Sequence, residues 1–231
     1  MLRIILFFSL LSAAYVSYGQ QTFIVNDKIA PDITAQYHVL KDSPDVKQGR
    51  YLALYKKKIV AAMGNYERGK QTSIWHFYDP SGKIVQHYNF STKQLIYEVP
   101  DDTLSYKISY DFDKKIADTD RVTKPIRIGD IFYGYQPYLK LFKIDASTLN
   151  RQPLLYVVLQ VLVSPNGRLA ECKLVVRARL NNNIVDSYLI NNESLTDDDK
   201  LFIPATINHE NVSSTIYILC KLTPNGGVSI Y

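Results

Sequence analysis

Recognisable catalytic motifs are missing from this sequence of 231 residues. It contains no Gly-x-Ser-x-Gly nucleophile turn, no His-Glu-x-x-His metal motif, no phosphate-binding loop and no dinucleotide-binding glycine pattern. Each of these motifs places a nucleophile, a metal or a phosphate where the chemistry needs it. We therefore expect a protein that is not an enzyme and that carries no cofactor.

Cysteine is scarce, with two residues in the whole chain, Cys172 and Cys220. In the strands that we predict for them, both side chains point toward the protein core. If another strand lies between theirs, the two alpha carbons are about 9–10 Å apart, beyond the roughly 7 Å that a disulfide can span. We expect two buried free thiols.

Histidine is also rare, and the pair His76 and His87 flanks a Pro-Ser-Gly turn. A three-residue hairpin loop that pairs Asp79 with Lys83 would place these two histidines on opposite faces of the hairpin. With no third ligand nearby in the sequence, we predict no metal site here.

Positive charge is nowhere concentrated, apart from Lys56, Lys57 and Lys58. Lysine and arginine total 27 against 22 acidic residues, which gives a net charge of +5. A nucleic-acid interface needs basic residues gathered on one surface. The spread of charge therefore predicts no nucleic-acid partner.

Long apolar runs are absent except at the start, "MLRIILFFSLLSAAYVSYGQ". Arg3 precedes an apolar run from 4 to about 16, and Ser17 and Gly19 supply small residues at a cleavage site, which together indicate a signal peptide over 1–19. The run is shorter than the roughly 20 residues that cross a membrane, and no cysteine near Gly19 could carry a lipid. We expect a periplasmic or secreted protein with no transmembrane span after cleavage.

Helical periodicity is also scarce, and short alternating runs of Tyr, Val, Ile and Leu fill most of the chain. Three turns share a Pro-x-Gly pattern, "YDPSGK" at 78–83, "VSPNGR" at 163–168 and "LTPNGG" at 222–227. Proline favours the first central position of a type I turn, and glycine accepts the left-handed position that follows. The sequence predicts an α+β fold that is predominantly β.

Residues 49–93 contain an internal echo, in which Lys-Ile-Val triplets and tyrosines recur at about 23 residues. Each copy would form one strand pair that must stack on the next to bury its apolar face. The stretch resembles MORN-type repeats, which implies a scaffold or a binding surface. We assign residues 20–150 to β-hairpin repeats followed by an aromatic connecting segment.

The connecting segment contains "DIFYGYQPYLKLF" at 130–142. Its aromatic residues could form a stacking platform for a glycan or a peptide. We favour the alternative that they are buried against a neighbouring domain, because aromatic side chains dominate core burial. The residues concerned are Phe132, Tyr133, Tyr135 and Tyr138.

The last part of the chain, 151–231, predicts a strand, strand, helix, strand module. The almost wholly apolar run 154–163 should lie in the middle of a sheet. The alternating run 169–180 should lie beside it, with one face exposed to solvent. The stretch "ESLTDDDKLFIP" has a helix cap at Ser194 or Thr196, an acidic first turn and a terminating proline, and so predicts a short helix. A third strand follows at 215–222.

This module, over about 154–223, resembles the C-terminal domain of TonB-like proteins. The resemblance rests on the "SPNGRL" turn and on "PATINHENVSSTIYI", with its spacing from Pro204 and Ala205 to Val212. It implies a cell-envelope domain that binds other proteins by adding a strand to a sheet edge.

The same resemblance places the third predicted strand, 215–222, at an edge of the sheet. We expect Thr215, Tyr217, Leu219 and Lys221 to contact a partner there. The partner would be an envelope protein, a peptide segment or a second copy of the chain. Two alternatives stay open: the N-terminal repeats could cover this edge, or the protein could bind surface glycans through its aromatic residues.

Overall fold

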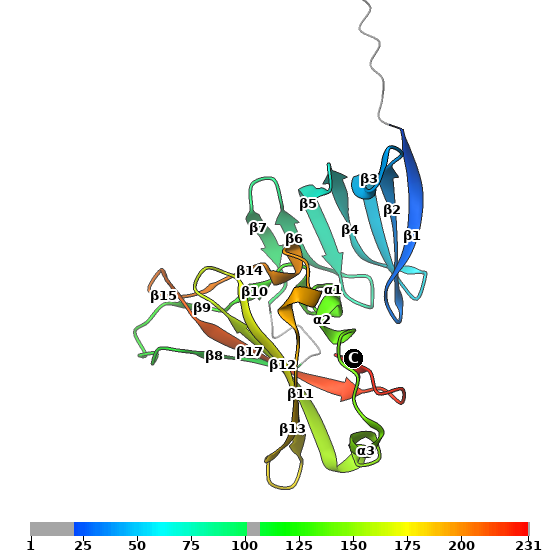
Figure 1. Cartoon of the computed structure of the whole chain (residues 1–231). Coiled ribbons are helices and arrows are strands. Elements are labelled where there is room, and N and C mark those ends of the chain that lie inside the picture. Colours follow the sequence, from blue (N-terminus) through cyan, green and yellow to red (C-terminus); the bar gives the residue numbers. More distant parts are fainter. Residues whose placement is uncertain (1–20, 101–106, 231) are drawn as a thin grey trace, which may run out of the picture.

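The computed structural model describes residues 21–100 and 107–230, and the predicted signal peptide lies outside them. The described chain is mostly antiparallel β-sheet with a few short helices, which confirms the predicted fold class (Figure 1). Among these residues no helix has the length and apolarity needed to traverse a bilayer.

The first sheet has seven strands that follow one another in chain order, each hydrogen-bonded to the next (Figure 1). Its strands are β1 (Thr22–Ala30), β2 (Ile33–Leu40), β3 (Ser43–Tyr55), β4 (Ile59–Glu67), β5 (Lys70–Tyr78), β6 (Ile84–Asn89) and β7 (Gln94–Glu98). The echo at 49–93 therefore lies in consecutive hairpins of one sheet, as the sequence pattern favours.

The second sheet has the order β13-β12-β11-β17, with β8 and β18 both pairing with the far side of β17. Its strands are β8 (Ile108–Phe112), β11 (Leu155–Val163), β12 (Leu169–Ala178), β13 (Ile184–Leu189), β17 (Ser214–Leu222) and β18 (Val228–Ser229). The prediction that the apolar run of β11 is central is confirmed, since it lies between β12 and β17.

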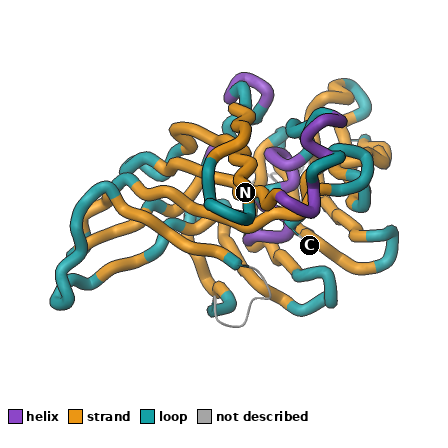
Figure 2. The backbone as a smooth tube through the Cα atoms, turned by 90° about the horizontal axis from the view of Figure 1, so that it is seen from below, coloured by secondary structure: helices purple, strands orange, loops and turns teal. Residues whose placement is uncertain are grey.

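Short elements connect and cover the two sheets. The strands are β9 (Val122–Thr123), β10 (Ile126–Arg127), β14 (Phe202–Ile203), β15 (Ala205–Ile207) and β16 (Glu210–Val212). The helices are α1 (Asp130–Gly134), α2 (Gln136–Leu139), α3 (Ala146–Leu149) and the single 3₁₀ turns η2 (Gln152–Leu154), η3 (Asn192–Ser194) and η4 (Asp198–Lys200). Seen from below, most of the helical segments lie near the middle of the molecule, with strands on both sides of them (Figure 2).

The three Pro-x-Gly turns form as predicted. In each turn the glycine has a positive φ, at Gly82, Gly167 and Gly226. In the first, the Gly82 amide donates to the Asp79 carbonyl and the Asp79 amide donates to the Lys83 carbonyl, and the other two turns repeat this pattern. Local turn chemistry thus fixes the β5–β6, β11–β12 and β17–β18 connections.

The predicted helix near 194–203 is much shorter than expected. Thr196 and Asp199 do form a reciprocal cap, with the Asp199 amide donating to Thr196 Oγ1 and the Thr196 amide donating to Asp199 Oδ2. The segment then makes one 3₁₀ turn, because Phe202 and Ile203 pair with β10 as strand β14. Strand pairing stops the helix before a second turn can form.

Residues 107–150, which we grouped with the repeats, contribute much of the second sheet's packing. They supply β8, and their apolar side chains cover the inner face of β11, β12 and β17. The side chains that do so are Ile131, Tyr135, Tyr138, Leu139, Phe142 and Ile144.

A buried glutamine ties the first sheet to this connecting segment. Gln86 on β6 is fully buried, and its amide nitrogen donates to the Arg127 carbonyl at 3.1 Å. Its amide oxygen accepts from the Gly129 backbone at 2.7 Å. Both polar ends are satisfied, so burial of this side chain costs little. The two bonds fix where β6 meets the rest of the described chain, residues 107–230, which we call the second module.

Candidate functional site

The strand expected to be a free edge is covered, and that prediction is wrong. Strand β17 pairs with β11 on one side and with β8 on the other, from Ser214 opposite Phe112 to Ile218 opposite Ile108. The residues Lys221 and Leu222 pair with β18. Backbone groups bonded on both sides cannot accept an added strand.

The four predicted contact residues therefore lie on a sheet face or against β18. Thr215 and Tyr217 are half-buried, Leu219 is 36% exposed and Lys221 is exposed. Tyr217 and Leu219 line a shallow hollow on the outer face of the second sheet together with Val158, Gln160 and Arg177. They belong to a mixed polar and apolar surface.

The edge of this sheet lies at β13, a strand that we did not predict from the sequence. Within the described residues β13 is the last strand on its side and pairs with β12 alone, from Leu189 opposite Lys173 to Ile184 opposite Arg177. Its outer backbone groups are arranged to pair with another extended chain. Tyr188 packs on the inner core and donates its hydroxyl to Asp145 at 2.8 Å, which anchors the strand.

Apolar side chains are unusually exposed along this edge and at the hairpin end beside it. The Arg179 amide donates to the Leu154 carbonyl, which brings Leu154 next to the β12–β13 turn. The exposed fractions are 96% for Leu180, 68% for Leu154, 59% for Ile184, 38% for Val185 and 68% for Leu189. We call these five residues with β13 the apolar edge. An exposed apolar cluster on an unpaired strand is a feature of binding surfaces.

The aromatic segment does not form an exposed platform. Phe132, Tyr135 and Tyr138 are 2%, 1% and 0% exposed. They are buried because the segment folds into α1 and α2 and packs inward, as the favoured prediction had it. Tyr133 alone of the four is half-buried, and its hydroxyl lies 2.6 Å from that of Tyr51 on β3.

Tyr133 lines a cavity of about 580 Å³ between the first sheet and the second module. This volume lies within the roughly 300–1,000 Å³ of small-molecule sites. We call it the inter-module cavity. Aromatic rings form one part of its wall and charged groups another: Tyr51, Tyr66, Phe77, Phe90 and Tyr133, with Asp27, Asp45, Lys47, Arg127, Asp198 and Asp199.

Lys47 is caged by tyrosine rings at the rim of this cavity. Its Nζ lies 4.6 Å from the ring centre of Tyr37, 5.1 Å from that of Tyr66 and 5.7 Å from that of Tyr51. These distances are within the range of cation–π attraction. Burial lowers the pKa of the Lys47 ammonium, and the carboxylates of Asp27, Asp199 and Asp198 oppose that shift.

Burial also raises the tyrosine pKa values in this wall, that of Tyr133 to about 12. The phenols are therefore neutral hydrogen-bonding groups at neutral pH. The cavity can offer ring faces, hydroxyl groups and carboxylates to a polar ligand. Of its lining residues, the sequence pointed only to Tyr133 and, through the recurring tyrosines of 49–93, to Tyr66. Tyr37, Tyr51 and Tyr66, one on each of three neighbouring strands, were the signal that could have identified them.

Arg127 is buried where the modules meet. Its Nε donates to the Gly134 carbonyl at 2.9 Å and its Nη1 to the Leu201 carbonyl at 2.6 Å. Its Nη2 lies 3.9 Å from Asp199. These bonds join α1 to η4, so the guanidinium serves the packing of this junction.

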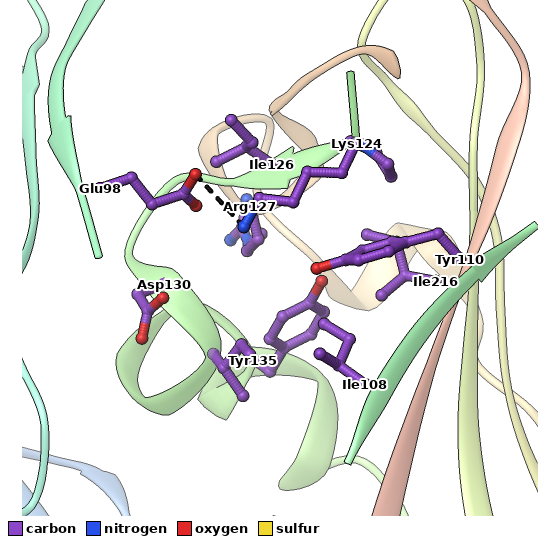
Figure 3. A pocket seen from close by; sticks show the side chains of 11 residues that line it. Glu98, Ile108, Tyr110, Lys124, Ile126, Arg127, Asp130, Tyr135 and Ile216 are labelled. Atoms are coloured by element: carbon purple, nitrogen blue, oxygen red, sulfur yellow. Dashed lines mark ion pairs between the residues drawn. The ribbon is translucent and has the colours of Figure 1, made fainter. Parts of the chain in front are cut away.

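Asp130 lies near Arg127, beside a void of about 20 Å³ (Figure 3). The same void is lined by Glu98 and Lys124, which form an ion pair at 3.4 Å. Asp130 is 4% exposed, and burial raises its pKa to about 6. The void has room for about one water molecule and is too small for any organic ligand.

His76 and His87 face each other, which corrects the expectation that they lie on opposite faces. They are directly paired across β5 and β6 with their Nδ1 atoms 2.7 Å apart. The turn has the predicted Asp79–Lys83 pairing, but a bulge follows it, since Tyr78 pairs with Ile84 and Phe77 with Gln86. The extra residue reverses the side on which His87 points.

Within 21–100 and 107–230, no group of three or more His, Cys, Asp or Glu side chains is arranged to hold a metal ion. Cys172 and Cys220 are free and buried, as predicted.

No protein-family model matches this chain, and no curated protein or solved structure matches it either. The resemblances to MORN-type repeats and to TonB C-terminal domains stay predictions, and function has to be argued from the surfaces described above.

Proposed function

We propose that this protein is an exported, non-catalytic protein-binding component of a bacterial cell envelope, and that its partner adds an extended segment along β13. The observation that carries the proposal is the apolar edge, where an unpaired strand coincides with the most exposed apolar side chains of the second module. Strand addition needs free backbone groups for affinity and alternate side-chain contacts for selectivity.

The side chains of the apolar edge define what the partner segment should look like. Ile184 and Leu189 lie beside Arg177 and Lys173 on the outer face of the sheet. A segment with apolar residues at alternate positions would cover Ile184 and Leu189. Acidic residues beside them would pair with Arg177 and Lys173. The bulge at Val185 breaks the ladder near one end of β13, so the longest regular pairing is available from Asp186 to Leu189.

Site-specific crosslinking tests this proposal. A photoreactive side chain at the exposed position Ser187 should capture the partner from envelope extract, and Leu189→Lys should abolish that capture, because lysine on an edge strand opposes pairing. Ile96→Lys is the matched control, since Ile96 is 55% exposed on β7, at an edge of the first sheet. Equal capture by the wild type and Leu189→Lys would refute the proposal.

Amide exchange supplies a second measurement on the same strand. The amides of β13 that point away from β12 should exchange fast in the free protein and slow when the partner is bound. Slow exchange of all β13 amides in the free monomer would refute the free edge. Protection that appears with rising protein concentration, with no partner present, would identify a second copy of the chain as the occupant.

A second candidate function, glycan binding, is favoured by the aromatic and carboxylate lining of the inter-module cavity. Here Tyr133→Ala should weaken binding on a glycan array, and Tyr217→Ala, on the outer face of the second sheet, should leave it unchanged. If both variants bind glycans on the array as well as the wild type does, the cavity is not the glycan site.

A further inference from the structure

Four side chains form a row across the outer face of the first sheet. Met63 on β4 pairs with His76 on β5, His76 pairs with His87 on β6, and His87 pairs with Tyr97 on β7. Residues directly opposite each other on neighbouring strands project to the same side and lie within about 5.5 Å at their β-carbons. The row therefore brings a thioether and two imidazoles together on one surface.

The two imidazoles are already close to the spacing of a metal-ligand pair. Their Nδ1 atoms are 2.7 Å apart, and the rings meet edge to face with centroids 4.6 Å apart and planes at 88°. Two nitrogen ligands at about 2.0–2.1 Å from one metal ion lie roughly 2.8–3.4 Å apart for angles of about 90–110°. Small movements of the rings would convert the present contact into a chelate.

The bulge that creates this pair is held in place by the second module. Val85 and Gln86 are both buried, at 3% and 0% exposure, so His87 is the next residue free to point outward. Gln86 is bonded to the backbone of Arg127 and Gly129, which fixes the register of β6. The pairing of His76 with His87 is therefore built into the packing of the protein.

Met63 provides a third donor. The Tyr78 hydroxyl donates to its sulfur at 3.4 Å, which places the thioether on the same face as the histidines. A methionine side chain has three rotatable bonds and can swing its sulfur toward His76. Sulfur and imidazole donors together favour monovalent copper over hard cations such as calcium or magnesium.

We propose that Met63, His76 and His87 form a surface site for a copper(I) ion. The site is independent of the partner-binding edge, which lies on the other sheet. The half-buried histidines stay accessible to solvent, so an ion can reach them without unfolding.

The test is a titration of the full chain with copper(I) against a chromophoric copper(I) chelator. We expect one equivalent to bind, and we expect His76→Ala and His87→Ala each to weaken binding by more than the roughly 10–100-fold that loss of an outer-shell group costs. Met63→Leu, which keeps the size of the side chain, should weaken copper(I) binding and spare copper(II) binding by the two nitrogens.

Matched controls separate this site from other copper donors. Each histidine variant keeps Cys172 and Cys220, so copper bound by thiols would persist in them. His209→Asn removes an exposed histidine elsewhere, at a positive φ that asparagine tolerates, and should bind copper(I) like the wild type. Unchanged unfolding midpoints of the metal-free variants would show that they fold.

Wild-type affinity in both His76→Ala and His87→Ala would overturn the proposal. Wild-type copper(I) affinity in Met63→Leu would overturn the assignment of Met63 as the third ligand.

Discussion

Replacing Asp130 by asparagine should stabilise the protein at neutral pH. The side chain is 4% exposed, and within the described part of the chain its Oδ2 has no hydrogen-bond partner. Burial raises the pKa of this carboxyl to about 6, with a smaller contribution from Glu98, while the amides of Ile131 and Phe132 and the Lys124 ammonium act in the opposite direction. Asparagine keeps the shape and tolerates the positive φ of 58° at this position.

The magnitude follows from the pKa. A rise from 3.8 to about 6 corresponds to about 3 kcal/mol of unfavourable free energy for the ionised form, as an upper estimate. Between about pH 4 and pH 6 the folded protein holds a proton that the unfolded chain has released, so the free energy of unfolding falls as pH rises. Below about pH 4 both states are protonated and the penalty vanishes.

Urea unfolding of the wild type and Asp130→Asn, at pH 7.5 and near pH 4, measures this effect. Other carboxylates titrate in the same range, but they are shared by the two proteins and cancel in the difference. We expect the variant to be more stable by up to about 3 kcal/mol at pH 7.5 and nearly equal near pH 4. An equal difference at both pH values would refute the electrostatic argument and leave a packing effect.

Three further predictions concern packing and pairing. Gly64→Ala should cost about 1–3 kcal/mol of stability and change the emission of the single tryptophan, because a β-carbon there would lie 2.3 Å from the Trp75 ring. Urea unfolding followed by fluorescence measures both effects. Cys172 and Cys220 should resist thiol reagents in the native protein and react in denaturant without a reductant, since burial raises the pKa of Cys220 to about 12. The amides of 214–218 should exchange slowly in the isolated monomer, since β17 has a neighbouring strand on both sides.

Local chemistry made the turns and the central strand predictable. A proline followed two residues later by glycine restricts a few dihedral angles, and nothing distant is needed to interpret it. The almost wholly apolar run of β11 likewise requires cover on both faces. The two inward-facing cysteines followed from the same alternation.

The binding edge was misplaced because strand order depends on distant segments. Strand β8 covers β17 from about a hundred residues earlier in the chain, and no feature of 108–112 indicates its neighbour. Strand β13 was hidden by its asparagine-rich flanks. Asn182 adopts a φ of 64° in the hairpin turn, which asparagine tolerates well, so these asparagines marked a turn between strands.

The histidine pair shows how one residue can change the chemistry that a surface offers. The side-chain period of a strand is two, so a single bulged residue exchanges the faces of everything that follows it. Here the bulge is fixed by Gln86, whose partners Arg127 and Gly129 belong to a segment about 40 residues away in sequence. A mutation such as Gln86→Val, which removes those two hydrogen bonds from a buried site, should therefore act at a distance. It should loosen the β6 register and weaken copper(I) binding without touching any donor atom.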